Sequence, residues 1–447
     1  MDLRDKMTEE TPKTEELTEE IKEETAEETP RTEETAPETA EGAAESAEAP
    51  ENAETEAQTE PEAEDGRKKK KPSLAKRIKA SGFFGPGTKI MCCLCLLGLA
   101  VYIASRFLPG FAEFWTRYPS HWLRFLLAKA TGWIPFSLAE ALLLCLPLIA
   151  VGYIVCSAVS TKRDPSTKNY VRWVRPVVCV ILAVAFTFFA GFGPAYGRYK
   201  LADNLGLDDE PVSAQDLYIT AIDVTLDLQP LLAEITFDSD GASVMPYGYD
   251  EMAEIVNAAY EKFADKVDFI SHFGSYPKPI ALSEPMTYTH IAGVYTFMTG
   301  EANVNTNYPD FLNAFTMAHE MSHQRGIARE DEANFTAFLV CIGSEDVYVR
   351  YCGYANLLNY LLSSLRSADK ELYDSYRRTM LPDEIIGEFN SYSRFFDKYR
   401  ESTASKVTGA VNDAYLKSQN QKAGSKSYGL MVDLAVAYYK ALAANSN

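Results

Sequence analysis

Three nearly uncharged stretches of about twenty residues each constrain this chain more than any other feature of its sequence. They cover residues 89–107, 137–160 and 176–197. An α-helix needs about 20 apolar residues to cross the hydrocarbon core of a bilayer. The first stretch follows a long N-terminal segment and a basic run, so it does not have the layout of a cleaved signal peptide. The sequence therefore predicts a membrane region over residues 85–197, with three transmembrane helices in the lipid bilayer.

The positive charges predict how these helices are oriented. Basic segments lie at 66–79, before the first stretch, and at 161–175, between the second and the third. Short loops rich in Lys and Arg stay on the cytoplasmic side of a membrane. The aromatic-rich loop at 111–133 is then expected in the outer interface. Three crossings from a cytoplasmic N-terminus make residues 198–447 an extracytoplasmic domain.

The acidity of the chain belongs to its N-terminal segment. Residues 1–66 hold 25 Asp/Glu and 5 Lys/Arg, a net charge of −20, which equals the formal charge of −20 for all 447 residues. The segment is Glu, Thr, Ala and Pro with few large apolar side chains, so it cannot bury enough surface to fold. We interpret residues 1–80 as a disordered acidic cytoplasmic tail that ends in a basic run. A solvated spacer is the simpler interpretation, a protein-docking tail is the alternative, and no nucleic-acid partner is expected.

The region after the third stretch is predicted to be mainly α-helical with a small sheet. Ser213 begins a capping box that starts one helix, and apolar residues at helical spacing predict another at 250–264. Residues 267–300 are rich in β-branched and aromatic residues and broken by Pro and Gly, which indicates short strands and turns. Further helices are expected at 310–326, 329–343, 346–366, 369–379, 383–402 and 427–443. Two cysteines of this domain, Cys341 and Cys352, either pair or remain buried free thiols.

The stretch "AHEMSHQRG", residues 318–326, carries a metal-binding pattern. His319 and His323 are four residues apart on the predicted helix, so both imidazoles leave the same face and can bind one ion. Glu320 is the glutamate of an HExxH motif, a residue that takes a proton from the attacking water and is not itself a ligand. The plainer alternative is a helix whose histidines only cap or pack. The pattern favours Zn²⁺ as cofactor, with Glu320 as the catalytic base.

A zinc site of this kind needs a third protein ligand, and three acidic residues follow at 330–332. Gly326 can reverse the chain so that the next helix returns towards the histidines. On that helix Glu330 and Asn334 share a stripe of small residues, whereas Glu332 falls on the opposite side. This favours Glu330 as ligand and Asn334 as the residue that supports it. Glu332 is the alternative if the helix starts later, and Asp331 is a weaker candidate.

An HExxH helix followed by a glutamate on a second helix resembles the gluzincin group of zinc metallopeptidases. The run "EDEANFTAF" is similar to the Glu-x-x-Ala-Asn/Asp signature of M48-like and ImmA/IrrE-type peptidases, and the resemblance implies that Glu330 binds zinc. Residues 85–445 resemble an uncharacterised family of bacterial three-span membrane proteins with an HExxH domain, through "TGEANVN", "AHEMSHQRG" and "AREDEANF". The resemblance implies an α+β, zincin-like extracytoplasmic domain. The gap between His323 and Glu330 is shorter than in most gluzincins.

The segment "GEANVN" follows a predicted strand near this motif. Zinc peptidases often hold substrate by backbone pairing along an edge strand. Gly300, Glu301, Asn303 and Asn305 are therefore candidates to line a substrate cleft, and a structural turn is the alternative.

Four further residues could belong to the same site. His272 and His290 lie in strand-like segments and are interpreted as histidines with ordinary packing or surface roles. Arg325 and Tyr428 are weaker candidates to donate a hydrogen bond to an oxyanion.

Together these features predict a membrane-anchored zinc metallopeptidase that hydrolyses peptide or protein substrates outside the cytoplasm. The alternative is a metal-stabilised sensor or binding protein of the cell envelope that turns nothing over. A transporter is disfavoured, because between their ends the three stretches hold one charged residue, Glu140.

Overall fold

The computed structural model describes residues 73–208, 210–400, 402–423 and 430–446, so residues 1–72 of the tail predicted at 1–80 lie outside the described residues. The disorder predicted for the end of that tail is wrong, because residues 74–80 are helical. Within the described residues, three helices are long and apolar enough to cross a membrane, as the sequence predicted. They are α4 (Pro86–Phe107), α7 (Leu138–Arg163) and α8 (Thr167–Phe186), which continues as the π-helix η2 (Thr187–Phe192) and the 3₁₀-helix η3 (Gly193–Gly197). A short helix, α3 (Leu74–Ala80), precedes them.

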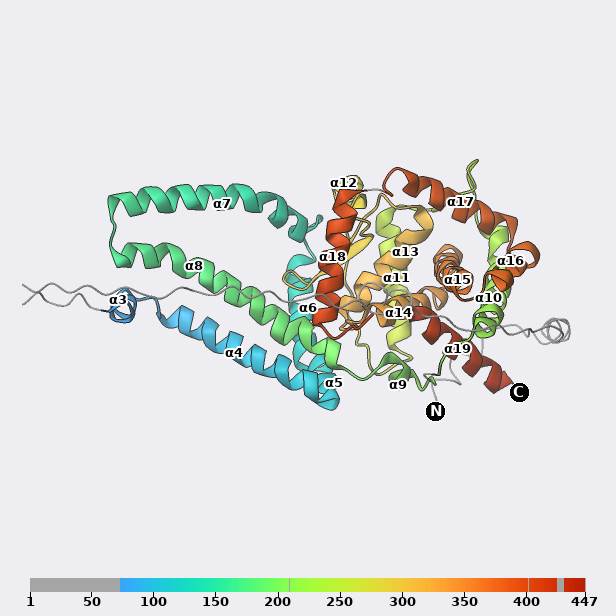
Figure 1. Ribbon diagram of the computed structural model, residues 1–447, viewed down its shortest axis with the longest axis horizontal. Helices are drawn as coiled ribbons and strands as arrows, with labels where there is room; N and C mark the ends of the chain where they lie inside the picture. Colours follow the sequence, from blue (N-terminus) through green and yellow to red (C-terminus); the bar gives the residue numbers. More distant parts are fainter. Residues whose placement is uncertain (1–72, 209, 401, 424–429, 447) are drawn as a thin grey trace, which may run out of the picture.

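The three long helices are packed unequally (Figure 1). Helices α4 and α8 lie side by side, and Gly98 permits this because a Cβ there would stand 3.2 Å from the ring of Phe186. Helix α7 contacts α8 near the turn that joins them and the C-terminal domain at its first residues, and its middle stands apart. None of its residues is buried by the described part of the chain. Its apolar surface is therefore available to lipid along its whole length.

The connection between the first two long helices is a pair of helices, α5 (Pro109–Arg117) and α6 (Pro119–Thr131). The sequence predicted an interfacial segment here. The two helices are separated at Pro119, which has no N–H to donate the next hydrogen bond of α5. Tyr118 and Trp122 are exposed, 58% and 60% respectively. The pair is packed against both the long helices and the C-terminal domain, so it joins the two parts of the molecule.

The C-terminal region is a helical domain built around a three-stranded sheet. The strands are β1 (Lys278–Pro279), β2 (Gly293–Thr296) and β3 (Glu301–Val304), in the order β1-β3-β2, with β1 parallel and β2 antiparallel to β3. The helices are α9 (Leu201–Leu205), α10 (Ala214–Leu228), η4 (Gln229–Glu234), α11 (Tyr249–Ala264), α12 (Ser283–Thr287), α13 (Asp310–Gln324), α14 (Glu330–Ile342), α15 (Val347–Ala368), α16 (Lys370–Thr379), α17 (Asp383–Asp397), α18 (Thr403–Ser418) and α19 (Met431–Ser446).

Local sequence explains several of these boundaries. The Ser213 hydroxyl accepts from the N–H of Asp216, whose carboxylate accepts from the N–H of Ser213, which is the predicted capping box of α10. Gly326 has a φ of 92°, a conformation that favours glycine, and it reverses the chain between α13 and α14. The helix predicted at 383–402 ends instead at Asp397. Ser402 then caps α18, a helix that the sequence analysis did not predict.

Helix α13 lies at the centre of the domain, in contact with α14, α15, β2 and β3. Its apolar residues Phe311, Ala314 and Met321 are buried in the main hydrophobic core. Cys341 and Cys352 are buried, free thiols in the same core, in agreement with one of the two alternatives. This central position carries the polar face of α13 into the interior as well, and that face forms the candidate site.

Candidate metal centre

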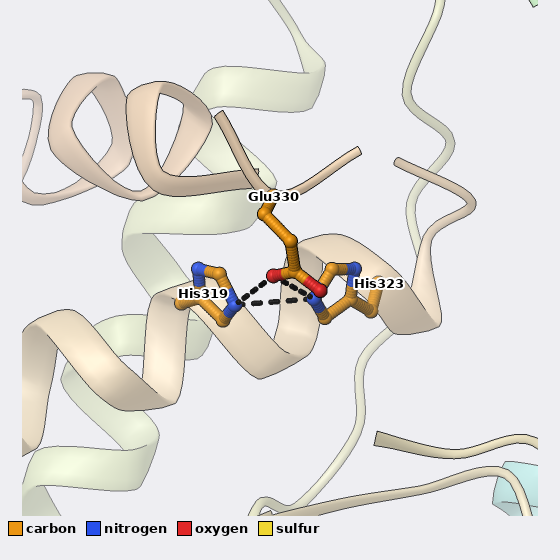
Figure 2. Close-up of side chains that lie close together, drawn as sticks. All are labelled: His319, His323 and Glu330. Carbon is orange, nitrogen blue, oxygen red and sulfur yellow. Dashed lines mark hydrogen bonds and ion pairs between the residues drawn. The ribbon is translucent and has the colours of Figure 1, made fainter. Parts of the chain in front are cut away.

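Three predicted ligands meet at one point inside the domain (Figure 2). The Nε2 atoms of His319 and His323 are 3.1 Å apart, and Glu330 Oε2 lies 3.3 Å from each of them. All three residues are buried, and one ligand atom from each lies within 4.8 Å of the others. The helical spacing of four residues places both imidazoles on one face of α13, and the turn at Gly326 brings the first residue of α14 over them.

The spacing of these atoms fits a tetrahedral metal ion. An ion 2.0–2.1 Å from each ligand atom would hold those atoms about 3.3–3.4 Å apart, close to the separations observed. The Nδ1–H of His323 donates to the carbonyl of Ile327 at 2.7 Å, which turns its Nε2 atom towards the centre. Two imidazoles and one carboxylate could therefore hold a metal and leave a fourth position open.

The two candidate third ligands are clearly separated. Glu330 is the first residue of α14 and points to the histidines. Glu332 accepts from the backbone N–H of Leu201 at 2.8 Å and pairs with Arg329 at 2.5 Å. The structure thus brings Glu330, and not Glu332, to the two histidines. Asn334, one turn further along α14, is buried and hydrogen-bonded to the hydroxyl of Tyr360.

Glu320 lies beneath strand β2. It is 4% exposed, and a Cβ on Gly293 would stand 2.6 Å from its Oε1 atom, so only glycine leaves room for the carboxylate at that point of the strand. The backbone of Tyr295 donates to the same carboxylate. Its Oε2 atom is buried and has no hydrogen-bond partner among the described residues. Such an atom is costly unless something else occupies the site, and a water beside a metal ion would supply the missing partner.

The electrostatics of the centre reflect its burial. Burial raises the pKa of Glu320, and the two neighbouring histidines oppose that rise. Burial by itself lowers the pKa of His323, but the Glu330 carboxylate outweighs it and raises that pKa to about 9. For Glu330 burial is again the largest influence, yet the histidines prevail and hold the pKa well below its usual range. Glu330 is therefore ionised at neutral pH, whereas the pKa of Glu320 lies above its ordinary value.

The end of the third long helix forms one wall of the centre. The ring of Phe192, in η2, meets the ring of His323 edge to face with 6.0 Å between centroids. Phe192 also packs on Tyr196 and Tyr295 in a small cluster of its own. The hydroxyl of Tyr196 donates to that of Tyr415 of α18 at 3.3 Å. Sequence patterns gave no sign of this wall, because its residues lie inside an apolar stretch that already had an explanation.

A buried arginine fixes the C-terminal end of α13. Arg124 of α6 is 2% exposed, and its guanidinium donates to the carbonyl oxygens of Gln324 at 3.0 Å, Thr116 at 3.0 Å and Gly191 at 3.2 Å. These carbonyls include the negative end of the α13 dipole, which a cation stabilises. Burial lowers the pKa of Arg124 to about 10, so it remains charged at neutral pH.

The four positions predicted to line a substrate cleft are engaged inside the protein. Glu301, Asn303 and Asn305 lie on or directly after the middle strand β3 and are at most 2% exposed. Glu301 pairs with Lys278 at 3.1 Å and accepts from the first two N–H groups of α7. Gly300 has a φ of 71° and lies against α6. In the described part of the chain, the strand beside Glu320 is β2 instead.

The remaining candidates lie in other surroundings. His272 pairs with Glu261 at 2.5 Å, and His290 bonds with a backbone carbonyl at 2.8 Å, as ordinary surface and packing histidines do. The Arg325 guanidinium stacks 4.0 Å above the ring of Tyr260 and donates to a backbone carbonyl of α13. Tyr428 lies outside the described residues.

Comparison with known proteins gives one finding. No curated protein and no solved structure matches the chain. Residues 116–436 match a protein family, and this stretch covers helices α6, α7 and α8, the sheet and the candidate metal centre. Since the match includes well over half of the sequence, the chain belongs to the family described as "Protein of unknown function (DUF3810)".

Proposed function

We propose that this protein is a membrane-anchored zinc metallopeptidase whose zincin-like catalytic domain lies on the extracytoplasmic side of the membrane. One observation carries the proposal: three ligand atoms converge at tetrahedral spacing, and a buried glutamate with an unpartnered oxygen lies beside them. A purely structural zinc site is usually closed by four protein ligands, whereas a catalytic site has three and an open position. The donors present fit the second kind.

Zinc bound by these residues would lower the pKa of a coordinated water to about 7 and polarise the carbonyl of the scissile bond. Glu320 takes one proton from the attacking water, whose oxygen forms the new bond to the carbonyl carbon. Glu320 then gives that proton to the nitrogen of the leaving amine as the C–N bond breaks. The raised pKa of Glu320 suits both steps, and Gly293 and Tyr295 of β2 hold its carboxylate in place.

His323 and Glu330 have positioning roles of their own. The Ile327 carbonyl orients the His323 ring through Nδ1, so its Nε2 atom faces the ion. The lowered pKa of Glu330 keeps its carboxylate charged at neutral pH, as a metal ligand must be.

Three variants test the proposal in the purified full chain. Glu320→Gln should keep one zinc per chain and lower hydrolysis of a mixed peptide pool by about 10²–10⁴-fold, the usual contribution of a general base. Glu330→Gln should lose zinc, because it removes a charged ligand. Glu332→Gln is the matched control: it changes an acid two residues away that binds Leu201 and Arg329, and it should keep its zinc.

Two results would contradict the proposal. Equal zinc content in the Glu330→Gln and Glu332→Gln variants would show that the histidine pair does not use Glu330. Stoichiometric zinc with no hydrolysis that depends on Glu320 would favour the alternative, a metal-stabilised sensor or binding protein of the cell envelope.

A further inference from the structure

The metal centre is tied directly to the membrane part of the molecule. Arg124, from the helix pair between the first two long helices, binds the last carbonyls of the HExxH helix. Phe192, near the end of the third long helix, packs on a metal-binding histidine. These contacts come from two different membrane-side elements, and both are buried. The centre therefore cannot lie far from the membrane, nor can it swing away without breaking these contacts.

The depth of the centre follows from the aromatic side chains of α5 and α6. Phe114, Tyr118, Trp122 and Trp133, on and just after these helices, are each more than half exposed. Exposed Trp and Tyr at the ends of membrane helices mark the headgroup region of a bilayer. Because Arg124 lies on the same short helix as Trp122, the end of α13 is held at headgroup depth.

Apolar surface continues from the long helices onto the domain around the centre. Val294 of β2, the strand beside Glu320, is 43% exposed, and Met298, two residues after the end of that strand, is 44% exposed. Helix α18, on the side of the domain that faces the long helices, presents Val407 and Val411 with 60% and 65% exposure, one turn apart. Exposed apolar residues that cluster near a membrane helix indicate contact with lipid or with a membrane-bound partner.

Helix α18 also connects to the long helices through polar contacts at its end. Tyr415 meets Tyr196 of η3, and Gln419, just after the helix, accepts from the hydroxyl of Tyr102 of α4 at 2.8 Å. The site thus has membrane-side elements on one flank and, close by, a helix with an exposed pair of valines. A water-soluble peptide has no need of such surroundings, whereas a chain already held in the bilayer meets them without leaving it.

We propose that the substrate is a membrane-anchored polypeptide, cut in the segment that leaves the bilayer, at the depth of the lipid headgroups. This rests on the proposed peptidase function and adds the substrate class to it. Recognition would come chiefly from position: the anchor confines the scissile bond to the depth at which α6 and η2 hold the metal. Such confinement raises the effective concentration of the bond at the site without requiring a specific sequence.

The test compares one cleavable pool at two depths. The full-length protein is reconstituted with zinc in vesicles of phosphatidylethanolamine and phosphatidylglycerol. A mixed-sequence peptide pool is joined to a transmembrane helix either directly or through a rigid helical spacer of about 30 residues, about 45 Å long. Both pools have the same density in the membrane, so they differ in depth alone. The Glu320→Gln variant gives the background, and mass spectrometry locates the cuts.

We expect the directly joined pool to be cut at least about tenfold faster than the spaced pool, with the cuts next to the anchor. Equal rates for the two pools, or faster cutting of the spaced pool, would overturn the depth inference and leave the peptidase function standing. If neither pool is cut above the Glu320→Gln background, while the same peptides free in solution are cut, the inference also fails. If nothing is cut in any form, the peptidase function fails and this inference with it.

Discussion

Helix α7 exposes large apolar side chains, whereas helix α13 buries polar and charged ones. Leu143, Leu148 and Ile154 of α7 are 69%, 77% and 63% exposed, and no residue of that helix is buried. In α13, His319, Glu320 and His323 are at most 9% exposed. In an ordinary soluble domain large apolar side chains lie inside, and charged ones are almost never fully buried unless they are paired.

Each of the two helices therefore indicates a component of its surroundings that is not part of the polypeptide: lipid for α7 and a cation for α13. An entirely apolar exposed helix is stable where lipid surrounds it, and a buried cluster of two imidazoles and two carboxylates is stable where a cation joins it. Exposure is therefore informative when the side chain is apolar, and burial is informative when the side chain is polar or charged. We expect changes in α13 to alter the response to metal and changes in α7 to alter insertion into the bilayer.

The largest effect should come from taking the metal away from α13. A ligand present at a thousand times its dissociation constant stabilises the folded state by about 4 kcal/mol. Chelation, or the substitution His323→Ala, should therefore lower the melting temperature of the purified protein, and zinc should restore it only in the unsubstituted chain. His272→Ala, at a surface histidine that pairs with Glu261, is the control and should keep the zinc response. If the chelator left the melting temperature unchanged, a bound cation would not be what stabilises the buried polar residues of α13.

A charge on α7 should give the next largest effect. Arginine at the centre of a membrane helix costs about 2.5–3.5 kcal/mol in insertion, whereas a surface substitution on a soluble helix changes stability by at most about 0.5 kcal/mol. Leu148→Arg should therefore reduce the membrane-integrated fraction of the chain, and Leu148→Met should not. Alkaline extraction of membranes separates integrated from peripheral protein. Full integration of the arginine variant would mean that α7 does not face lipid at this position.

How much of the molecule the sequence could predict depends on the range of the contacts. The HExxH spacing, the turn at Gly326 and the approach of Glu330 are set within a dozen residues by helical periodicity, and the structure brings these residues together as expected. The contact from Arg124 to Gln324 joins residues 200 apart along the chain, and no local pattern encodes it. Residue type alone could only mark Arg124 as a charge among aromatics.

Two other differences also have physical causes. Glu301 was a cleft candidate because it follows a strand, yet in the structure it binds the orphan N–H groups at the start of α7, a role that requires knowing which helix end lies nearby. Helix α18 was not predicted, because Gly409 and four β-branched residues weaken its helical pattern. Its signal was present in the Ser402 cap and the spacing of Val407 and Val411.

A moderate effect is expected at the glycine that makes room for Glu320. In Gly293→Ala the new Cβ would stand 2.6 Å from Oε1 and 2.7 Å from Cγ of a carboxylate that is itself buried. Inserting a methyl group into a packed interior costs about 1–3 kcal/mol. The variant should lose that much stability in denaturant unfolding. Gly409→Ala, in α18 with nothing within 4 Å of its Cβ, is the control and should be neutral or stabilising by up to about 1 kcal/mol. Equal responses at the two sites would mean that β2 does not confine Glu320.

The smallest effect concerns Asp223, a half-buried acid of α10 that is not part of the candidate metal centre. Burial, and then the neighbouring Asp227 on the same face of α10, raise the pKa of Asp223 from 3.8 to about 6. A folded-state pKa above the unfolded one means that the group favours folding below about pH 4, and that this stability is lost as the pH rises through 6. Because the side chain is partly exposed, solvent screening reduces the effect to about 1 kcal/mol.

Asp223→Asn should therefore raise the free energy of unfolding by about 1 kcal/mol at pH 7 and leave it unchanged at pH 4. An equal gain at both pH values would mean that the charge of Asp223 is not what costs stability. The expected result would set Asp223 apart from the candidate metal centre, where we propose that a cation offsets the burial of Glu320 and Glu330.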